Sequence, residues 1–176
     1  AVRDQSASVQ PVSGEYGEQF RWGLDRFMSE ARTLAQFKHP NIVRVFTVYP
    51  ENNTAYMVME NGQGIGMHDL LRNKATLPED KLMAIILPIL DGLQQVHDAG
   101  FIHRDIKPEN ILLDSDGSSY LSDFGIAKIV NEAEYEESKT LYSPYSAPEE
   151  WRNEVVTPST DVYQLGVALF EMLTGK

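Results

Sequence analysis

The sequence predicts an α+β fold, in which helices and strands form separate stretches. The order of the patterns is the first observation: helix, hairpin, helix, short strands, helix, with most strand-like residues before residue 60. The second is that hydrophobic residues make up 42% of the 176 residues, which is enough for a packed core. The third is the length of 176 residues, which suits one domain of ordinary size or part of a larger one.

The first element expected along the chain is an amphipathic helix. Residues 1–19 are polar and lack periodicity, so we expect a loop there. From Phe20 to Phe37, apolar residues recur every three or four positions, which predicts a helix with one apolar face. The helix should end at His39-Pro40, because the residue before a proline avoids the α region.

A β-hairpin is expected next. Residues 42–49 and 55–59 are rich in β-branched and aromatic side chains, and Pro50–Asn53 between them are typical turn residues. A glycine-rich stretch, residues 61–66, follows the hairpin. Its glycines do not have the spacing of a dinucleotide-binding loop, so we interpret the stretch as a flexible link.

The rest of the chain is mainly helical. A long helix should have Pro78 in its first turn and Gly100 just past its end. Short strands follow, then an irregular segment over residues 123–149, and a last apolar helix from Asp161 to about Leu173.

Composition excludes several classes of function. The formal charge of −11 and the pI near 4.7 argue against general nucleic-acid binding, which requires a basic surface. The absence of cysteine excludes disulfides, thiolate zinc sites and a cysteine nucleophile. The longest apolar run, Leu82–Leu90, is too short to cross a bilayer, and the start of the chain has no signal-peptide pattern.

One short stretch concentrates chemically useful side chains. Asp105, Lys107 and Asn110 lie close together in the loop after the long helix. A hairpin over residues 111–121 would return Asp123 to the side of Asn110, and the two could then share a hard cation such as Mg²⁺. A proton acceptor, an ammonium group and a metal site together fit phosphoryl transfer, in which positioning and charge neutralisation do most of the catalysis.

These residues also make the chain resemble the protein kinase family. Residues 103–110 read H-R-D-I-K-P-E-N, residues 123–125 read D-F-G, and residues 147–149 read A-P-E. Three such blocks in this order are a specific signal, and the resemblance runs from about Phe20 to the end of the chain. The residues around these motifs are most similar to those of bacterial Ser/Thr kinases. The resemblance therefore implies ATP and Mg²⁺ as cofactors and a protein Ser/Thr hydroxyl as acceptor.

The resemblance implies catalytic or metal-binding roles for five residues. Asp105 would be the base, and Lys107 would stabilise the transferring phosphate and point to Ser/Thr substrates. Asn110 and Asp123 would hold magnesium. Glu30 matches the glutamate of the family's αC helix, which pairs with the ATP-binding lysine.

Further roles follow from the same resemblance. Residues expected at the adenine are Met59, Glu60, Asn61, Gly62, Met67 and Leu112. Structural residues are Leu34, Val45, His103 and Phe124, which would stack as a spine, with His97, Asp161 and Glu149. We expect His97 to hydrogen-bond Asp161, which would support the catalytic loop. Regulatory candidates are Arg104 and the phosphate acceptors Ser138, Thr140 and Ser143.

The kinase reading predicts a two-lobe fold present in part. Residues 1–60 would be a partial N-lobe with the αC helix and the following hairpin, and residues 61–176 a helical C-lobe through the family's αF helix. The glycine loop and ATP-binding lysine should precede Ala1, and the arginine that pairs with Glu149 should follow Lys176. We therefore expect these residues alone to bind ATP weakly and to transfer no phosphate. In a gapless reading Tyr142 replaces the threonine that contacts the catalytic residues.

Two other functions remain open at this point. A pseudokinase would use the same fold as a scaffold for partners, although Asp105, Lys107, Asn110 and Asp123 are all intact. A small-molecule phosphotransferase would share the catalytic aspartate but lack D-F-G and A-P-E. For a protein kinase we expect a cytoplasmic location, or the cytoplasmic part of a membrane-anchored protein, with no nucleic-acid partner.

Overall fold

The computed structural model describes residues 2–3, 9–10, 15–62, 64–72, 76–124 and 143–176. These residues divide into two compact units. Described residues up to Lys38 and Arg44–Glu60 belong to the first unit, and His39–Val43, Asn61–Phe124 and the residues from Ser143 onward belong to the second. Residues 39–43 group with the second unit because the N–H of Val43 donates to the carbonyl of Leu121 at 2.9 Å.

Helix α1, Glu15–Leu34, is the long helix of the first unit. It begins five residues before the predicted start, because helix-forming residues there extend it beyond the apolar stripe from which the helix was predicted. It ends three residues earlier than predicted, where the N–H groups of Gln36 and Phe37 bond carbonyls three residues back. The predicted N-terminal loop also contains two short paired strands, β1 (Val2–Arg3) and β2 (Val9–Gln10).

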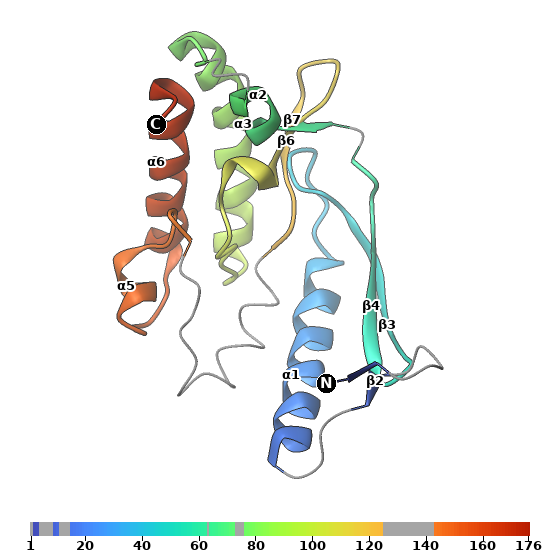
Figure 1. The fold of residues 1–176 in the computed structure, drawn as a ribbon. Helices are drawn as coiled ribbons and strands as arrows, with labels where there is room; N and C mark the ends of the chain where they lie inside the picture. The colour runs from blue at the N-terminus through green and yellow to red at the C-terminus, as the bar shows by residue number, and fades with distance from the viewer. Residues whose placement is uncertain (1, 4–8, 11–14, 63, 73–75, 125–142) are drawn as a thin grey trace. The chain divides into compact units, whose positions relative to one another are not determined.

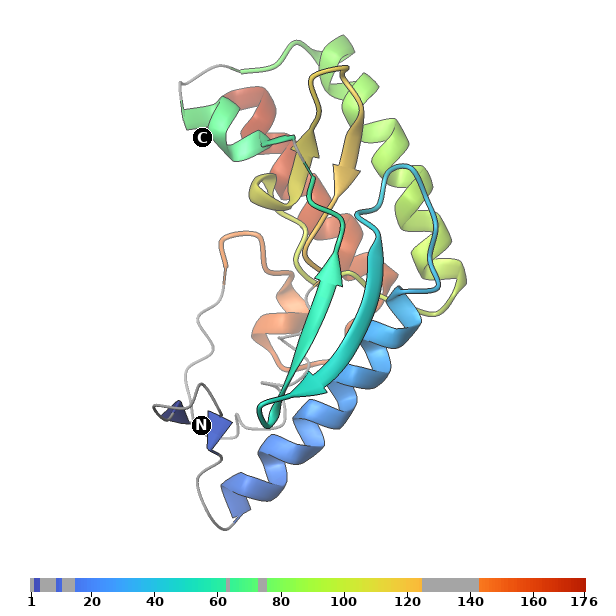
Figure 2. The ribbon, with the colours of Figure 1, turned by 90° about the vertical axis from the view of Figure 1, so that its right-hand side faces the viewer.

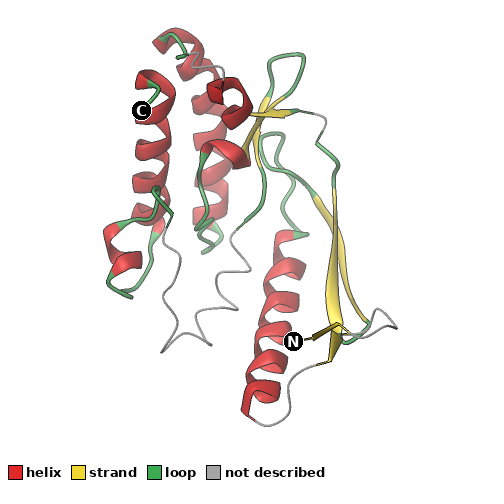
Figure 3. Cartoon of the chain, viewed as in Figure 1, coloured by secondary structure: helices red, strands yellow, loops and turns green. Residues whose placement is uncertain are grey.

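The predicted hairpin is present as β3 (Val45–Glu51) and β4 (Thr54–Met59), shown as yellow arrows in Figure 3. Its turn is shorter than predicted, since Pro50 and Glu51 are still paired with β4. Asn52 and Asn53 both have positive φ, 54° and 55°, which suits a two-residue hairpin turn whose twist matches that of the strands. The hairpin lies along α1, as Figure 2 shows, and contacts it through β3 and β4.

The second unit contains a small antiparallel sheet in the order β5-β6-β7. Strand β5 (Ile65–Gly66) pairs with β6 (Ile111–Leu113), and β6 pairs with β7 (Ser119–Leu121) as the predicted 111–121 hairpin. Helix α2 (Met67–Arg72) follows β5 directly, and the short 3₁₀ helix η1 (Pro108–Asn110) precedes β6. The long helix α3, Glu79–Asp98, contacts β7 of this sheet, and Figure 1 shows the two elements close together.

Helix α3 ends with a well-defined cap at Gly100. Gly100 has φ of 81°, its N–H bonds the carbonyl of His97, and the N–H of Phe101 bonds the carbonyl of Val96. This pair of bonds is the Schellman arrangement, which favours glycine because the left-handed conformation has no Cβ to clash. The cap ends α3 just before the loop of residues 101–107.

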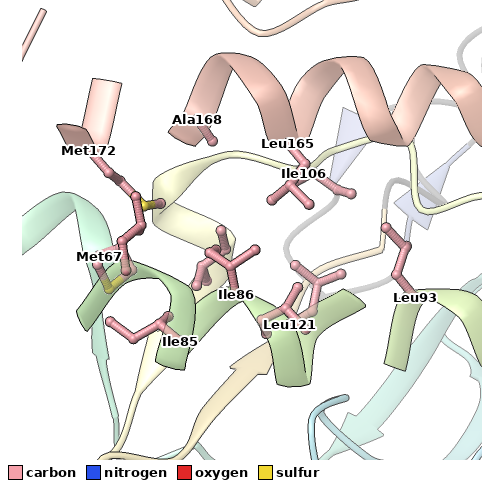
Figure 4. Packing of buried hydrophobic residues seen from close by; sticks show 12 residues of the cluster. Met67, Ile85, Ile86, Leu93, Ile106, Leu121, Leu165, Ala168 and Met172 are labelled. Atoms are coloured by element: carbon pink, nitrogen blue, oxygen red, sulfur yellow. The ribbon is translucent and has the colours of Figure 1, made fainter. Parts of the chain in front are cut away.

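Helix α6, Pro158–Thr174, is the final helix and packs against α3. The two helices share a core that Figure 4 shows from close by. Ile86 of α3, Leu165 of α6 and Ile106 from the loop between them meet in it, each at most 3% exposed. A four-residue helix, α5 (Pro148–Trp151), precedes α6, and the indole N–H of Trp151 donates to the carbonyl of Ser146. In the described part of the chain, none of the helices has the length and apolarity needed to cross a membrane.

Candidate active site

The loop of residues 101–107 connects α3 to η1 and is held by Asp161 of α6. The Asp161 carboxylate is fully buried and accepts the backbone N–H of His103 and of Arg104, each at 2.8 Å. It also accepts Nε2–H of His97 at 2.8 Å, so the hydrogen bond expected between His97 and Asp161 is present. A buried carboxylate with three donors is fully compensated, which makes it a firm anchor for the loop.

His103 joins this loop to the strand that leads to Asp123. The N–H of Asp105 donates to His103 Nδ1 at 3.3 Å, so Nε2 carries the proton and donates to the carbonyl of Ser122 at 3.1 Å. Complete burial lowers the pKa of His103 to about 4, which keeps the ring neutral at pH 7. The ring also lies against Phe124, with centroids 4.4 Å apart.

Asp105 lies at the centre of a polar cluster. Lys107 Nζ is 2.9 Å from Asp105 Oδ2, and Asn110 Nδ2 is 2.9 Å from the same oxygen. Asn110 Nδ2 also donates to the backbone carbonyl of Asp105 at 2.7 Å. The side chains of Asp105 and Lys107 are 18% and 29% exposed, so both reach solvent while their positions are fixed.

The β6-β7 hairpin places Asp123 next to Asn110, as the sequence predicted. The N–H of Ser122 donates to the carbonyl of Asn110 at 2.9 Å, and Asn110 Nδ2 lies 3.5 Å from the carbonyl of Asp123. Asp123 has a positive φ of 56°, and its exposed side chain accepts the hydroxyl of Ser122 at 3.2 Å. The side chains of Asp105 and Asn110 are therefore bonded to each other, and the backbone of Asp123 lies beside the Asn110 amide.

The donor set around Asp123 fits magnesium. The amide nitrogen of Asn110 donates hydrogen bonds to Asp105 and to the carbonyl of Asp123. The amide oxygen is the atom of this side chain that can bind a metal ion. A carboxylate oxygen of Asp123 and this amide oxygen are the hard ligands that Mg²⁺ prefers, with water and phosphate completing its shell. In the residues that the structure describes, no group of three or more histidines and carboxylates offers an alternative metal site.

The candidate residues of the first unit have their own surroundings. Glu30 pairs with Arg26 one turn earlier on α1, at 3.1 Å, and its side chain is 21% exposed. Leu34 and Val45 are buried, and Met59 is the last residue of β4. The N–H of Glu60 donates to the carbonyl of Arg44 at 2.8 Å.

The candidate nucleotide-contacting residues of the second unit lie around β5 and β6. Tyr120 of β7 packs against the glycine-rich stretch before β5. Its hydroxyl accepts the N–H of Gly64 at 3.0 Å. Its ring carbon Cε2 lies 2.9 Å from the position that a Cβ on Gly62 would take. Leu112 of β6 borders the same place. Met67 at the start of α2 is fully buried in the core cluster.

The expected regulatory and structural residues before α6 are only partly described. Ser138, Thr140 and Tyr142 lie outside the described residues. Ser143 is described, and its hydroxyl accepts the N–H of Tyr145. Glu149 is partly exposed and accepts the hydroxyl of Thr160 at 2.5 Å, a bond that lowers the pKa of its carboxyl. Glu149 therefore has a hydrogen-bond partner within the described residues, and its pairing with an arginine of the family stays a prediction.

Sequence reasoning missed one residue of this site, Gln164 of α6. It is 1% exposed and bonds the backbone at Arg104 and Ile106, on both sides of Asp105. A signal was available, because Gln164 is a polar residue on the face of α6 that also carries Leu165 and Ala168. A polar side chain on a buried helix face needs hydrogen-bond partners.

Comparisons with known proteins point to one family. Residues 13–176 match the family model described as protein kinase domain. The chain is 37% identical over 155 residues to the probable serine/threonine-protein kinase PknB of Lactococcus lactis, covering 87% of this chain and 25% of that protein. It is 34% identical over 176 residues to the serine/threonine-protein kinase PknL of Mycobacterium tuberculosis, covering 98% of this chain and 43% of that protein. The chain thus spans less than half the length of either relative.

Solved structures show the same fold. The apo form of PpkA-294 matches with a TM-score of 0.80 and 30% identity, covering 99% of this chain and 62% of that one. Rad53 residues 1–466 in complex with AMP-PNP match with a TM-score of 0.70 and 30% identity, covering 86% of this chain and 38% of that one.

Proposed function

The chain belongs to the protein kinase family, and on this premise we propose that it carries the catalytic residues of a serine/threonine protein kinase. Such an enzyme transfers the γ-phosphoryl group of ATP to a Ser or Thr hydroxyl of a protein. One observation carries the proposal: Asp105 Oδ2 has both Lys107 Nζ and Asn110 Nδ2 at 2.9 Å, next to Asp123. The names of the curated relatives and the AMP-PNP bound to Rad53 support the same activity and nucleotide.

Each residue has a defined part in this proposal. Asp105 orients the acceptor hydroxyl and takes its proton, and Lys107 faces the negative charge of the phosphoryl group in transfer. Asn110 and Asp123 hold Mg²⁺, which when bound neutralises the phosphate charges.

The nucleotide contacts belong to the proposal as well. The resemblance assigns Met59, Glu60, Asn61, Gly62, Met67 and Leu112 to adenine binding and Glu30 to the pair with the family's ATP-binding lysine. It assigns Leu34, Val45, His103 and Phe124 to the family's spine. The acidic charge of −11 supports a protein partner over nucleic acid, and we propose a cytoplasmic location.

Control by phosphorylation is part of the same proposal. Arg104 directly precedes Asp105, so we propose that a phosphate on Ser138, Thr140 or Ser143 pairs with its guanidinium and raises the activity. The variant with alanine at all three acceptors should be less active than the phosphorylated wild-type enzyme. Unchanged activity of the triple variant would remove this control.

The proposed function can be tested with the substitution Asp105→Asn in the full-length protein. We expect the KM for ATP to stay within a few fold and kcat to fall by about 10²–10⁴, because Asp105 acts on the hydroxyl and does not hold the nucleotide. Asp80→Asn, at an exposed position in the first turn of α3, is the matched control and should keep the wild-type rate.

The outcomes separate the alternatives. Wild-type protein that binds Mg·ATP but transfers no phosphate to any protein would support a scaffold and contradict the proposal. A wild-type rate in Asp105→Asn would remove Asp105 from the mechanism.

A further inference from the structure

Gln164 is buried and makes three hydrogen bonds. Its Oε1 accepts the N–H of Ile106 at 2.8 Å, and its Nε2 donates to the carbonyl of Arg104 at 3.2 Å. The same Nε2 donates to Glu150 Oε2 at 2.8 Å. The side chain is 1% exposed, so water cannot replace these partners.

The two loop contacts of Gln164 bracket Asp105. One lies at Arg104 and the other at Ile106, so the peptide units on both sides of Asp105 are tied to α6. Asp161, one turn earlier on α6, holds the N–H groups of His103 and Arg104. Together the two side chains fix the loop on both sides of the catalytic carboxylate.

The backbone of this loop needs such support. Arg104 has φ of 66°, a conformation that costs a residue with a Cβ free energy and persists only where the surroundings impose it. Asp161 bonds the N–H of Arg104 and Gln164 bonds its carbonyl, so both peptide groups of the strained residue are held. Loss of either bond would allow the Asp105 side chain to turn away from Lys107.

Glu150 connects Gln164 to the chain before α6. Glu150 Oε2 accepts Gln164 Nε2 at 2.8 Å and the N–H of Ala147 at 2.7 Å. The Ala147 bond fixes the start of α5, which follows directly on residues 143–146. Gln164 is therefore the point where the backbone around Asp105 meets the segment that leads into α5.

We propose that Gln164 is a positioning residue for phosphoryl transfer: it sets the orientation of Asp105 and couples it, through Glu150, to the position of α5. This inference rests on the proposed function. Gln164 has no contact with nucleotide in the proposal, so its effect should fall on kcat and leave the KM for ATP unchanged. A misplacement of about 1 Å can lower a rate about 10²-fold.

The first experiment is Gln164→Met, which keeps most of the side-chain volume and removes all three hydrogen bonds. We expect kcat to fall about 10- to 100-fold with the KM for ATP within threefold of wild type, assayed well below the melting temperature. Ala168→Gly is the matched control, because it weakens α6 on the same buried face without touching the loop. It should lower the melting temperature and keep kcat.

A double-mutant cycle tests whether Gln164 acts through Asp105. In Asp105→Asn protein, adding Gln164→Met should lower the residual rate by less than threefold, since the group that it positions is already lost. An equal fall in both backgrounds would overturn the proposal, as would wild-type kcat in Gln164→Met. If wild-type protein transfers no phosphate at all, the proposed function fails instead, and the two failures are thereby distinguished.

Exchange of the two partners tests the coupling to α5. Gln164→Glu places two carboxylates face to face in a buried site and should lower kcat by at least as much as Gln164→Met. Adding Glu150→Gln restores a donor–acceptor pair with reversed direction, and kcat should recover at least threefold over Gln164→Glu alone. No recovery would overturn the role assigned to Glu150.

Discussion

His103 donates through Nε2 to the carbonyl oxygen of Ser122 at 3.1 Å, a bond between the loop that carries Asp105 and the residue directly before Asp123. This bond and the bond that Nδ1 accepts from the N–H of Asp105 together require a neutral ring with its proton on Nε2. The protonation state of one buried histidine is thus tied to the relative placement of the two aspartates.

This state makes the stability of the fold depend on pH. Burial lowers the pKa of His103 to about 4 in the folded protein, whereas an unfolded histidine titrates near 6.5. As the pH falls below 6.5, His103 binds a proton in the unfolded chain but stays neutral in the folded chain. The free energy of unfolding therefore falls by about 3 kcal/mol between pH 6.5 and pH 4. Below pH 4 His103 is protonated in both states and contributes no further loss.

His103→Phe, which cannot titrate, should remove this part of the dependence. Urea unfolding of both proteins at several pH values between 4 and 7.5 measures the pH dependence of the free energy of unfolding. The titration of carboxylates contributes to both curves, so the difference between them reports on His103. Parallel curves for wild type and variant would show that His103 does not titrate as its burial requires.

Asp123→Ala should weaken the binding of Mg·ATP. In the proposal Asp123 is the anionic ligand of the metal that bridges the phosphates, and Asn110 alone offers a neutral oxygen. Calorimetric titration of ATP with and without Mg²⁺ measures the enhancement that the metal gives. Asp116→Ala, in the exposed turn of the β6-β7 hairpin, is the control that should keep the enhancement. Equal enhancement in Asp123→Ala and wild type would contradict the assignment.

Gly64→Ala should destabilise the second unit. A Cβ at this position would lie 2.7 Å from the Tyr120 hydroxyl and 2.8 Å from the backbone carbonyl of Leu113, which cannot move aside without disturbing β6. The expected loss in the free energy of unfolding is about 1–3 kcal/mol, measured by chemical denaturation.

Gly166→Ala in α6 is the matched glycine control. Its Cβ would meet no described atom within 4 Å, and alanine favours the helix, so a gain of about 0.5–1 kcal/mol is expected. A similar effect of the two substitutions would contradict the crowding at Gly64.

The elements with strong patterns could be predicted from the sequence, and the short or locally determined ones could not. The helices that became α3 and α6 have long apolar stripes, and the hairpins have alternating strands around turn residues. Helix α2 and strand β5 were missed because six and two residues are too few to show a period. The hairpin turn was placed too widely because Pro50 and Glu51 are turn residues by type but pair with β4.

The candidate site was predictable where a motif fixes both residue and spacing. Asp105, Lys107, Asn110 and Asp123 stand in such motifs, and the structure brings them together. Gln164 is a polar residue on a buried helix face, which indicates that it has hydrogen-bond partners. The sequence could not identify those partners, because two of them are backbone groups about 60 residues away. The pair of Arg26 and Glu30, one turn apart on α1, was not predicted, because the family resemblance assigns a lysine as the partner of Glu30.

The division into two units also gives each of them its own optical reporter. The chain has two tryptophans, Trp22 on α1 of the first unit and Trp151 on α5 of the second. Trp22 lies under the guanidinium of Arg26, 5.3 Å from the ring centroid, and the indole N–H of Trp151 bonds the carbonyl of Ser146. Replacing either tryptophan with phenylalanine leaves one fluorophore, so emission during denaturation follows one unit at a time.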